Sequence, residues 1–315
     1  MRYDARTGDQ GDQGEQGEQG VRISALKRAH LPAAAAMLAA ACPCDRAADV
    51  ADEKLFGDGP AGPPRALAAW DGGALAGVAA VAADRLRLLA VAPGARGRGI
   101  GGALLEACVA AARAAGARRL RTLDEPGNYL APGIDERNAA AIAWLERRGW
   151  QRRGGEARVN VLIDVRDNPR VSAARAADAA ARAADAGYAI RRARPDERAL
   201  VGAVAAEFGG AWPFELLRAL GHEPAGVHVA MRDGAYCAFA AHDGNNRGLG
   251  WFGPTGTWPA HRGRGLGEAL LLACLVDVAA AHSQCEVAWI GPRPFYEKVA
   301  GIAAERRFVV LAREL

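Results

Sequence analysis

Lysine is scarce in this chain of 315 residues: Lys27, Lys54 and Lys298 are its only lysines, although Lys and Arg together number 40. The basic residues do not alternate with aromatic ones, and 36 acidic residues reduce the formal net charge to +4. A nucleic-acid surface combines clustered basic side chains with aromatic side chains that stack on bases. This composition therefore argues against nucleic acid as a partner.

Long apolar runs are also missing. No uninterrupted apolar stretch approaches the length needed to span a membrane, and the N-terminus lacks the pattern of a secretory signal. The six cysteines include one close pair, Cys42 and Cys44, but no second pair or histidine cluster that would complete a metal site. We therefore expect a soluble, cytoplasmic protein in a reducing compartment, with no metal and no membrane partner.

The first 20 residues end in GDQGDQGEQGEQG, a repeat of glycine, glutamine and acidic residues with no apolar side chain to bury. Such a composition predicts a disordered tail over residues 1–20. From Val21 onward the chain has the alternating strand and helix patterns of a globular protein, and its length is sufficient for two domains.

The stretch ARGRGIGGALL begins at Ala95, and HRGRGLGEALL, identical at eight of eleven positions, begins at His261. Each stretch follows a predicted hairpin, around Asp71 in the first case and Asp233 in the second, and each continues into a long helix. The chain is therefore predicted to be a tandem duplication of α/β units, each with a mixed, mostly antiparallel sheet flanked by helices. The expected organisation is a tail at 1–20, domains at 21–166 and 187–315, and a helical connector at 167–186.

The repeated loop has the chemistry of an anion site. The first N–H groups of a helix lack partners within the helix and carry the positive end of its dipole. Glycines at the preceding turn allow these N–H groups to approach a phosphate closely, and Arg96, Arg98, Arg262 and Arg264 add positive charge. The Walker-type nucleotide loop is excluded because neither copy ends in Gly-Lys-Ser or Gly-Lys-Thr.

Two identities for the loop are left. A dinucleotide loop, GxGxxG, fits Gly97, Gly99 and Gly102, but Glu268 breaks this pattern in the second copy. The other pattern, Arg-x-x-Gly-x-Gly between a strand and a long helix, fits both copies. It resembles the acetyl-CoA loop of the GCN5-related N-acetyltransferases (the GNAT family), over nearly all of 21–165 and 187–315.

This resemblance implies that acetyl-CoA is the acyl donor, that the loop amides hold its pyrophosphate, and that two splayed strands admit its pantetheine arm. The residues that it assigns to the cofactor are Val91, Arg96, Gly97, Arg98, Gly99, Ile100, Gly101, Gly102 and Asn138 in the first copy, and Thr257, Arg262, Gly263, Arg264, Gly265, Leu266, Gly267 and Glu268 in the second.

The two copies keep different parts of the helix motif that follows in this family. The first keeps Asn138 but has Leu145 where the family has a tyrosine, whereas the second keeps Tyr296 and has no equivalent asparagine. A phenol is a suitable acid for a departing thiolate, so Tyr296 is predicted to be the catalytic general acid.

The general base is not determined by the sequence. Asp124 and Glu125 in the first copy, and Glu215 and His222 in the second, are the possible side chains, and transfer through ordered water needs none of them. The acceptor pocket is equally open. Its possible linings are Trp212 and Phe214 in the second copy, and Asn128 and Tyr129 in the first.

The favoured hypothesis is an N-acetyltransferase that transfers an acetyl group from acetyl-CoA to a small primary amine, with catalysis in the C-terminal copy. Two alternatives remain at this stage. One is a module that binds or senses acetyl-CoA without transferring a group, motivated by the different losses in the two copies. The other is a nicotinamide-dependent oxidoreductase, motivated by the GxGxxG match. The acceptor amine and the oligomeric state are left open.

Overall fold

The structure is a computed structural model that describes residues 20–315, so the predicted tail, apart from Gly20, lies outside the described residues. The N-terminal half is the segment from β1 to β7. Its elements are β1 (Arg22–Ala25), α1 (Leu31–Ala41), α2 (Ala51–Phe56), β2 (Arg65–Asp71), β3 (Ala74–Ala82), β4 (Arg85–Val91), α3 (Ile100–Ala114), β5 (Arg119–Thr122), β6 (Ile134–Asp135), α4 (Ala139–Glu146) and β7 (Gln151–Asp164).

The C-terminal half is the segment from α5 to β13. Its elements are α5 (Ala173–Asp185), β8 (Ala189–Arg192), α6 (Arg198–Glu207), α7 (Trp212–Leu220), β9 (Val227–Arg232), β10 (Ala235–His242), β11 (Trp251–Thr257), α8 (Leu266–Ala279), β12 (Gln284–Val287), α9 (Arg293–Val299) and β13 (Ala304–Glu314).

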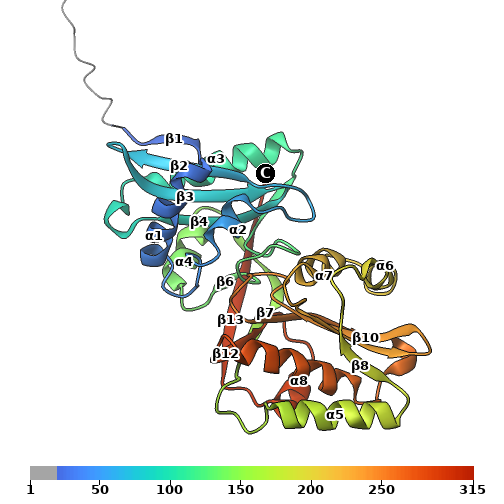
Figure 1. The fold of residues 1–315 in the computed structure, drawn as a ribbon. Coiled ribbons are helices and arrows are strands. Elements are labelled where there is room, and N and C mark those ends of the chain that lie inside the picture. Colours follow the sequence, from blue (N-terminus) through green and yellow to red (C-terminus); the bar gives the residue numbers. More distant parts are fainter. Residues whose placement is uncertain (1–19) are drawn as a thin grey trace, which may run out of the picture.

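All described strands join one 13-stranded sheet that runs through both halves (Figure 1). Its order is β1-β2-β3-β4-β5-β13-β7-β12-β11-β10-β9-β8, with the short β6 paired to β13. The two halves have therefore exchanged their last strands: β13 inserts between β5 and β7, and β7 pairs with β12. In this order, neither half contains all the strands of its own section of the sheet.

Helices cover both faces of each section of the sheet. In the N-terminal half, α3 and α4 pack on one face, and α1 and α2 pack on the other. In the C-terminal half, α5, α8 and α9 cover one face, and α6 and α7 cover the other (Figure 1). The predicted fold class, mixed and mostly antiparallel sheet flanked by helices, is confirmed, because only β4–β5 and β11–β12 are parallel among the described strand pairs.

Several elements differ from the sequence-based expectation. The sequence pattern indicated neither α2 nor α7, β6 lies in a segment expected to be irregular, and GLGWFGPTGTWP, which was expected to replace a strand, contains strand β11. The connector predicted at 167–186 contains α5, whose Ala179 and Ala183 are buried in the core that includes α8. This helix is therefore part of the C-terminal core as well as a link between halves.

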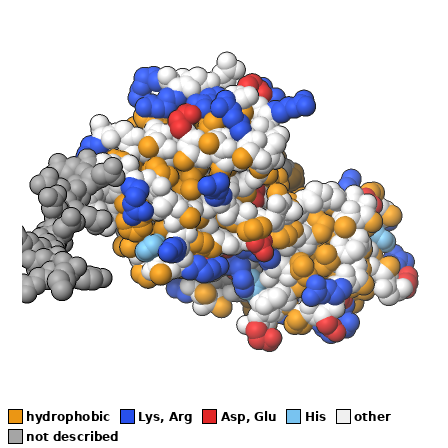
Figure 2. All heavy atoms as spheres, turned by 90° about the horizontal axis from the view of Figure 1, so that it is seen from above, with side chains coloured by type: hydrophobic (Ala, Val, Ile, Leu, Met, Phe, Trp, Pro, Cys, Tyr) orange, Lys and Arg blue, Asp and Glu red, His pale blue; other side chains and the backbone are white. Residues whose placement is uncertain are grey.

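The face shown in Figure 2 carries Lys and Arg side chains that gather at one end and are otherwise scattered among hydrophobic and neutral atoms. Within residues 20–315, no helix combines the length and the apolar character needed to cross a bilayer.

Candidate active site

The two glycine loops adopt the same backbone conformation. Gly97 and Gly99 have φ values of +78° and +80°, and Gly263 and Gly265 have values of +72° and +77°. These left-handed conformations favour glycine, because a side chain there would be strained. Gly99 and Gly265 are the N-caps of α3 and α8, and neither helix start is capped by a side chain. Both helix starts thus offer backbone N–H groups to an anion.

The first arginine of each loop braces the turn. Arg96 donates through Nε to the carbonyl of Val91, over 3.3 Å, and Arg262 donates in the same way to the carbonyl of Thr257, over 3.2 Å. Each guanidinium therefore ties its loop to the end of the preceding strand. This contact gives Val91 and Thr257 a shared structural position in the two copies.

The remaining predicted cofactor residues divide by exposure. The side chains of Ile100 and Leu266 are buried in the two cores, so these residues present only backbone to a ligand. Arg98 forms an ion pair with Asp71. Exposed or partly exposed positions of the two loops and the helix that follows are Gly101, Gly102 and Asn138 in the first copy, and Arg264, Gly267 and Glu268 in the second.

A slot opens between β11 and β12 directly before the second loop. These parallel strands pair at two positions, Trp251 with Glu286 and Phe252 with Val287, and β11 then continues to Thr257 beside β10 but without β12. The strands β4 and β5 pair at two positions in the same way, ending at Leu86 and Thr122. Splayed parallel strands expose backbone N–H and C=O groups that are free to bind an extended ligand.

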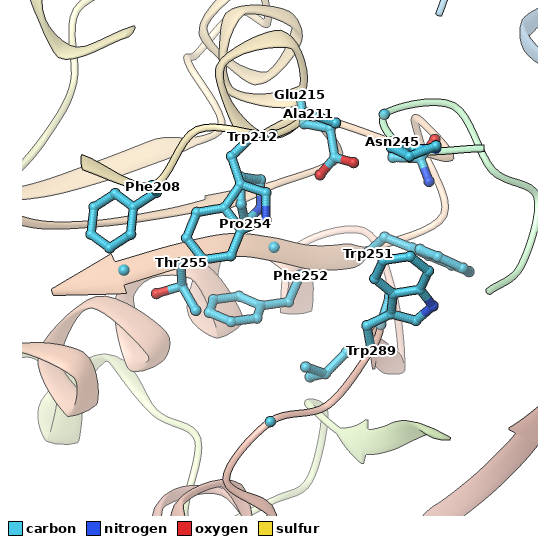
Figure 3. Close-up of a pocket in the computed structure, with 18 of the residues that line it drawn as sticks. Phe208, Ala211, Trp212, Glu215, Asn245, Trp251, Phe252, Pro254, Thr255 and Trp289 are labelled. Atoms are coloured by element: carbon cyan, nitrogen blue, oxygen red, sulfur yellow. The ribbon is translucent and has the colours of Figure 1, made fainter. Parts of the chain in front are cut away.

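A cavity of about 770 Å³ extends from the slot between β11 and β12 (Figure 3). It starts beside Gly267, in the first turn of α8, and reaches Glu215 on α7. Its walls come mostly from the C-terminal half, but the loop after β5 of the N-terminal half contributes Pro126, Gly127 and Tyr129. The space therefore joins one predicted phosphate loop to a region at the boundary between the halves.

Tyr296, on α9, lines this cavity. Its ring packs edge-on against Phe252 and Phe295, with centroids 6.3 and 5.0 Å away, and its hydroxyl forms no hydrogen bond with another described residue. Burial raises the pKa of Tyr296 to about 12, so the phenol is protonated at neutral pH. The hydroxyl is thus a proton donor without a protein acceptor.

Glu215, on α7, also lines the cavity, with its carboxylate directed into the space between Trp212 and Asn245 (Figure 3). Burial raises the pKa of Glu215 to about 7, against the opposing effects of Lys54, Arg218 and a hydrogen bond to the backbone of Gly127. A carboxyl group that titrates near neutrality is suited to accept and release a proton at physiological pH.

Comparisons with known proteins agree with this architecture. Residues 63–152 match the family model of the acetyltransferase (GNAT) domain. The GCN5-related glucosamine N-acetyltransferase region of a fungal multi-domain GH3 beta-N-acetylglucosaminidase is 18% identical, with a TM-score of 0.72 over 95% of this chain. This chain spans only 38% of that protein's length.

Two further structures match this chain over almost their whole length. A tandem GNAT protein from the clavulanic acid biosynthesis pathway is 22% identical, with a TM-score of 0.63, and 94% of this chain matches 98% of that one. This chain has the fold of a tandem GNAT protein. A GCN5-related N-acetyltransferase from Sphaerobacter thermophilus is 18% identical, with a TM-score of 0.60 over 93% of this chain and 95% of its own. Among curated proteins, none matches this sequence.

The two GNAT-like halves differ where the slot begins. Arg87 and Gly253 are the residues that directly follow the last parallel pair of each slot. Arg87 is fully buried and donates to both carboxylate oxygens of Glu125, over 2.5 and 2.6 Å. Gly253 has no side chain and lines the cavity. An ion pair thus fills in the N-terminal half the position that is open in the C-terminal half.

Several residues singled out as possible bases or pocket residues have other roles in this GNAT fold. Asp124 is buried in ion pairs with Arg85 and Arg158, and Glu125 is buried in an ion pair with Arg87, so both carboxylates are engaged within the N-terminal half. His222 bonds through Nε2 to the carbonyl of Asp243 and lines a different pocket.

The aromatic and amide residues predicted to line the acceptor pocket lie in different places. Tyr129 and Trp212 line the cavity, whereas Phe214 lines the neighbouring pocket. Asn128 is fully buried, accepts a hydrogen bond from Lys54 and donates to the carbonyl of Asp58, so it holds together segments of the N-terminal half.

The contribution of the N-terminal half to the cavity could not be found by reading motifs. Lys54 donates to the side chains of Asn128 and Asn245, over 2.8 and 2.9 Å, and Asn245 donates to the carbonyl of Tyr129. The two contacts of Asn245 cross between the halves and hold Tyr129 at the cavity. Their one sequence signal is the rarity of lysine, which makes a buried lysine such as Lys54 conspicuous.

Proposed function

We propose that this protein is an N-acetyltransferase that transfers an acetyl group from acetyl-CoA to a small primary amine in its C-terminal half. The GNAT domain match supports an acyl-CoA-dependent N-acetyltransferase activity in general. The observation that carries the finer proposal is the single cavity that runs from Gly267, at the second loop, past Tyr296 to Glu215.

Each part of this path has a role in the proposed reaction. The N–H groups that follow Gly265 hold the pyrophosphate, and the slot between β11 and β12 takes the pantetheine arm. Glu215 first removes a proton from the ammonium group, and the neutral amine nitrogen then forms a bond to the carbonyl carbon of the thioester. As the carbon–sulfur bond breaks, Tyr296 donates its proton to the sulfur, and the second proton that the nitrogen loses restores the phenol.

The N-terminal half would bind the donor without turnover. Its loop has the same geometry as the C-terminal loop, but the ion pair of Arg87 and Glu125 occupies the start of its slot, and Leu145 stands in place of the tyrosine. Separating the two side chains of this buried pair to admit a ligand would be costly, because each charge would then be left without its partner. We assign acyl transfer to the C-terminal half on this ground.

One similar structure is a glucosamine N-acetyltransferase region, and glucosamine is a primary amine. That activity belongs to its own protein. For this chain it is a reason to include an amino sugar among the acceptors to be tried.

The proposal is tested by titrating acetyl-CoA calorimetrically into the wild type and into two loop variants, Arg96→Glu/Gly99→Asp and Arg262→Glu/Gly265→Asp. Each variant adds negative charge where the loop would hold a diphosphate, so each should lose one binding site. Thiol release in the presence of a panel of primary amines should disappear only in the C-terminal loop variant.

Side-chain roles are tested with Tyr296→Phe and Glu215→Gln, which keep size while removing the acidic proton or the base. We expect kcat to fall at least about ten-fold in each, with acetyl-CoA binding retained. Binding at both loops with no amine-dependent thiol release across the panel would support the sensing module instead. Binding of NAD without binding of acetyl-CoA would support the oxidoreductase.

A further inference from the structure

The cavity wall carries only one acidic side chain and no basic side chain. Of its lining residues, Glu215 alone carries a carboxylate, and none is a lysine, arginine or histidine. The two tyrosines on the wall, Tyr129 and Tyr296, stay neutral because burial raises the pKa of both phenols. A ligand in this space therefore meets at most one charge from the wall, and that charge is negative.

The basic side chains near the cavity form ion pairs with acidic residues that do not line it. Arg218 and Lys54 both form ion pairs with Glu53, over 2.8 and 2.7 Å. Arg158 lies over the ring of Trp289 but pairs with Asp124. None of these three cations lines the cavity, so none is placed to pair with an anionic group of a ligand.

The rest of the wall is dominated by flat aromatic rings. Trp289 is 42% exposed, and its ring stacks on Tyr129, with centroids 5.5 Å apart and planes 6° from parallel. The other aromatic rings of the wall are Phe208, Trp212, Trp251, Phe252, Phe295 and Tyr296. Flat, rigid surfaces of this kind bind ring-shaped ligands through broad contact at little cost in side-chain entropy.

Polar side chains on the wall are largely committed to the protein itself. The amide of Asn245 donates to the carbonyl of Tyr129 and accepts from Lys54, and the hydroxyl of Thr255 donates to the carbonyl of Phe239. These contacts leave Glu215 as the wall's strong recognition group for a charged ligand.

We propose that the acceptor is a primary amine carried on an uncharged ring, with a single positive charge and no carboxylate or phosphate. The inference rests on the proposed acetyl transfer and specifies its acceptor. The ammonium group is attracted to Glu215, and the ring lies among the tryptophans. An aromatic ring and a sugar ring share this chemistry, so both belong to the test.

An anionic group on the acceptor would be strongly unfavourable. It would enter a space of low polarity with no cation to pair with, and it would be repelled by Glu215. A second ammonium group would be buried without a partner, because Glu215 can neutralise only one. The cavity thus selects against the wrong acceptor as much as it binds the right one.

The test uses amines in matched pairs, with acetyl-CoA-dependent thiol release as the readout for the full-length protein. Tryptamine is paired with tryptophan, glucosamine with glucosamine 6-phosphate, and cyclohexylmethylamine with 1,4-bis(aminomethyl)cyclohexane. We expect the singly charged member of the preferred ring type to exceed its partner about 100-fold in kcat/KM. The preferred pair tells an aromatic from a sugar acceptor.

The outcomes separate this inference from the function on which it rests. Turnover of the carboxylated, phosphorylated or doubly charged member at an equal or higher kcat/KM would overturn the inference and leave acetyl transfer intact. Absence of thiol release with every amine, despite acetyl-CoA binding, would overturn the proposed function.

A variant pair tests the same point from the protein side. Thr255→Lys places a cation on the wall across from Glu215, and Thr255→Met supplies similar length without charge. The lysine variant should reduce the selectivity for tryptamine over tryptophan, or for glucosamine over its phosphate, at least about ten-fold relative to the methionine variant. Equal selectivity in the two variants would contradict the assignment.

Discussion

Arg87 and Gly253 occupy the same point in the two halves, one residue past the last parallel pair of strands, and have opposite consequences. The guanidinium of Arg87 closes the slot with Glu125, whereas the missing side chain at Gly253 leaves the cavity open. One residue outside the loop thus separates a filled slot from an open one in two copies of the same loop.

Glu215 is a second residue whose properties depend on its surroundings, because burial and neighbouring charges set its pKa. Its pKa is raised to about 7 by burial and is lowered by Lys54 and Arg218, while Glu53 raises it further. Because a base must be ionised to accept a proton, kcat/KM should fall as the pH drops below about 7.

Replacing Arg218 by glutamine should shift this acid limb. The substitution removes a cation that favours the ionised carboxylate, so the pKa of Glu215 should rise and the limb should move by about half a pH unit to higher pH. Arg247→Gln is the matched control, because its exposed side chain is not among the groups that shift Glu215. The measurement is the pH profile of kcat/KM, and an unmoved limb in Arg218→Gln would exclude Glu215 as the titrating base.

At the residue scale, the sequence could identify the loops but not the base. Gly97, Gly99, Gly263 and Gly265 have a conformational requirement that is visible in their spacing, and all four have positive φ. The behaviour of Glu215 depends on Gly127 and Lys54, which are distant in sequence and come from the other half. No local pattern contains that information.

At the scale of elements, the pattern of apolar residues predicted the long helices and the hairpins. It did not indicate α7, whose Pro213 is well accommodated in the first turn of the helix. It also missed β11, where Pro254 lies within the register shift between β10 and β11 and therefore interrupts no regular ladder.

The strand exchange could not be predicted from the sequence. Periodicity indicates that residues 304–314 form a strand but does not specify its partner, and the pairing with β5 and β7 arises only in the assembled sheet. Its energetic weight is testable, because Leu311 on β13 is fully buried in the core of the N-terminal half.

Leu311→Ala should destabilise the half to which it does not belong in sequence. The cavity left in the core is expected to lower the free energy of unfolding by about 2–5 kcal/mol, as seen by denaturant titration. Hydrogen exchange should accelerate first in α3 and β5, and less in α8. Arg307→Ala, at an exposed position of the same strand, is the control. Faster exchange confined to the C-terminal half would contradict a shared core.

At the scale of the whole molecule, the continuous sheet makes the two halves thermodynamically dependent. The boundaries at 21–166 and 187–315 describe a repeat in the sequence, and we infer that they do not delimit two independently stable units. The interface adds to this dependence through Lys54, whose three hydrogen-bonding partners include residues of both halves.

Thermal unfolding tests this inference with two equivalent substitutions. Leu104 on α3 and Leu270 on α8 are both fully buried, one in each half. Wild type should give a single calorimetric transition, and Leu104→Ala and Leu270→Ala should each move that whole transition down by about 5 °C. Two resolved transitions, each sensitive to one substitution alone, would show independent halves.

The exchanged strands also have a consequence for folding during synthesis on the ribosome. About 140 residues separate the end of β7 from the start of β13. At a synthesis rate of about 5–20 residues per second, the strand that completes the first half emerges roughly 7–28 s after that half's own last strand. During that interval β5 and β7 present unpaired edges to neighbouring nascent chains, so production of this protein should depend on chaperones that shield such edges.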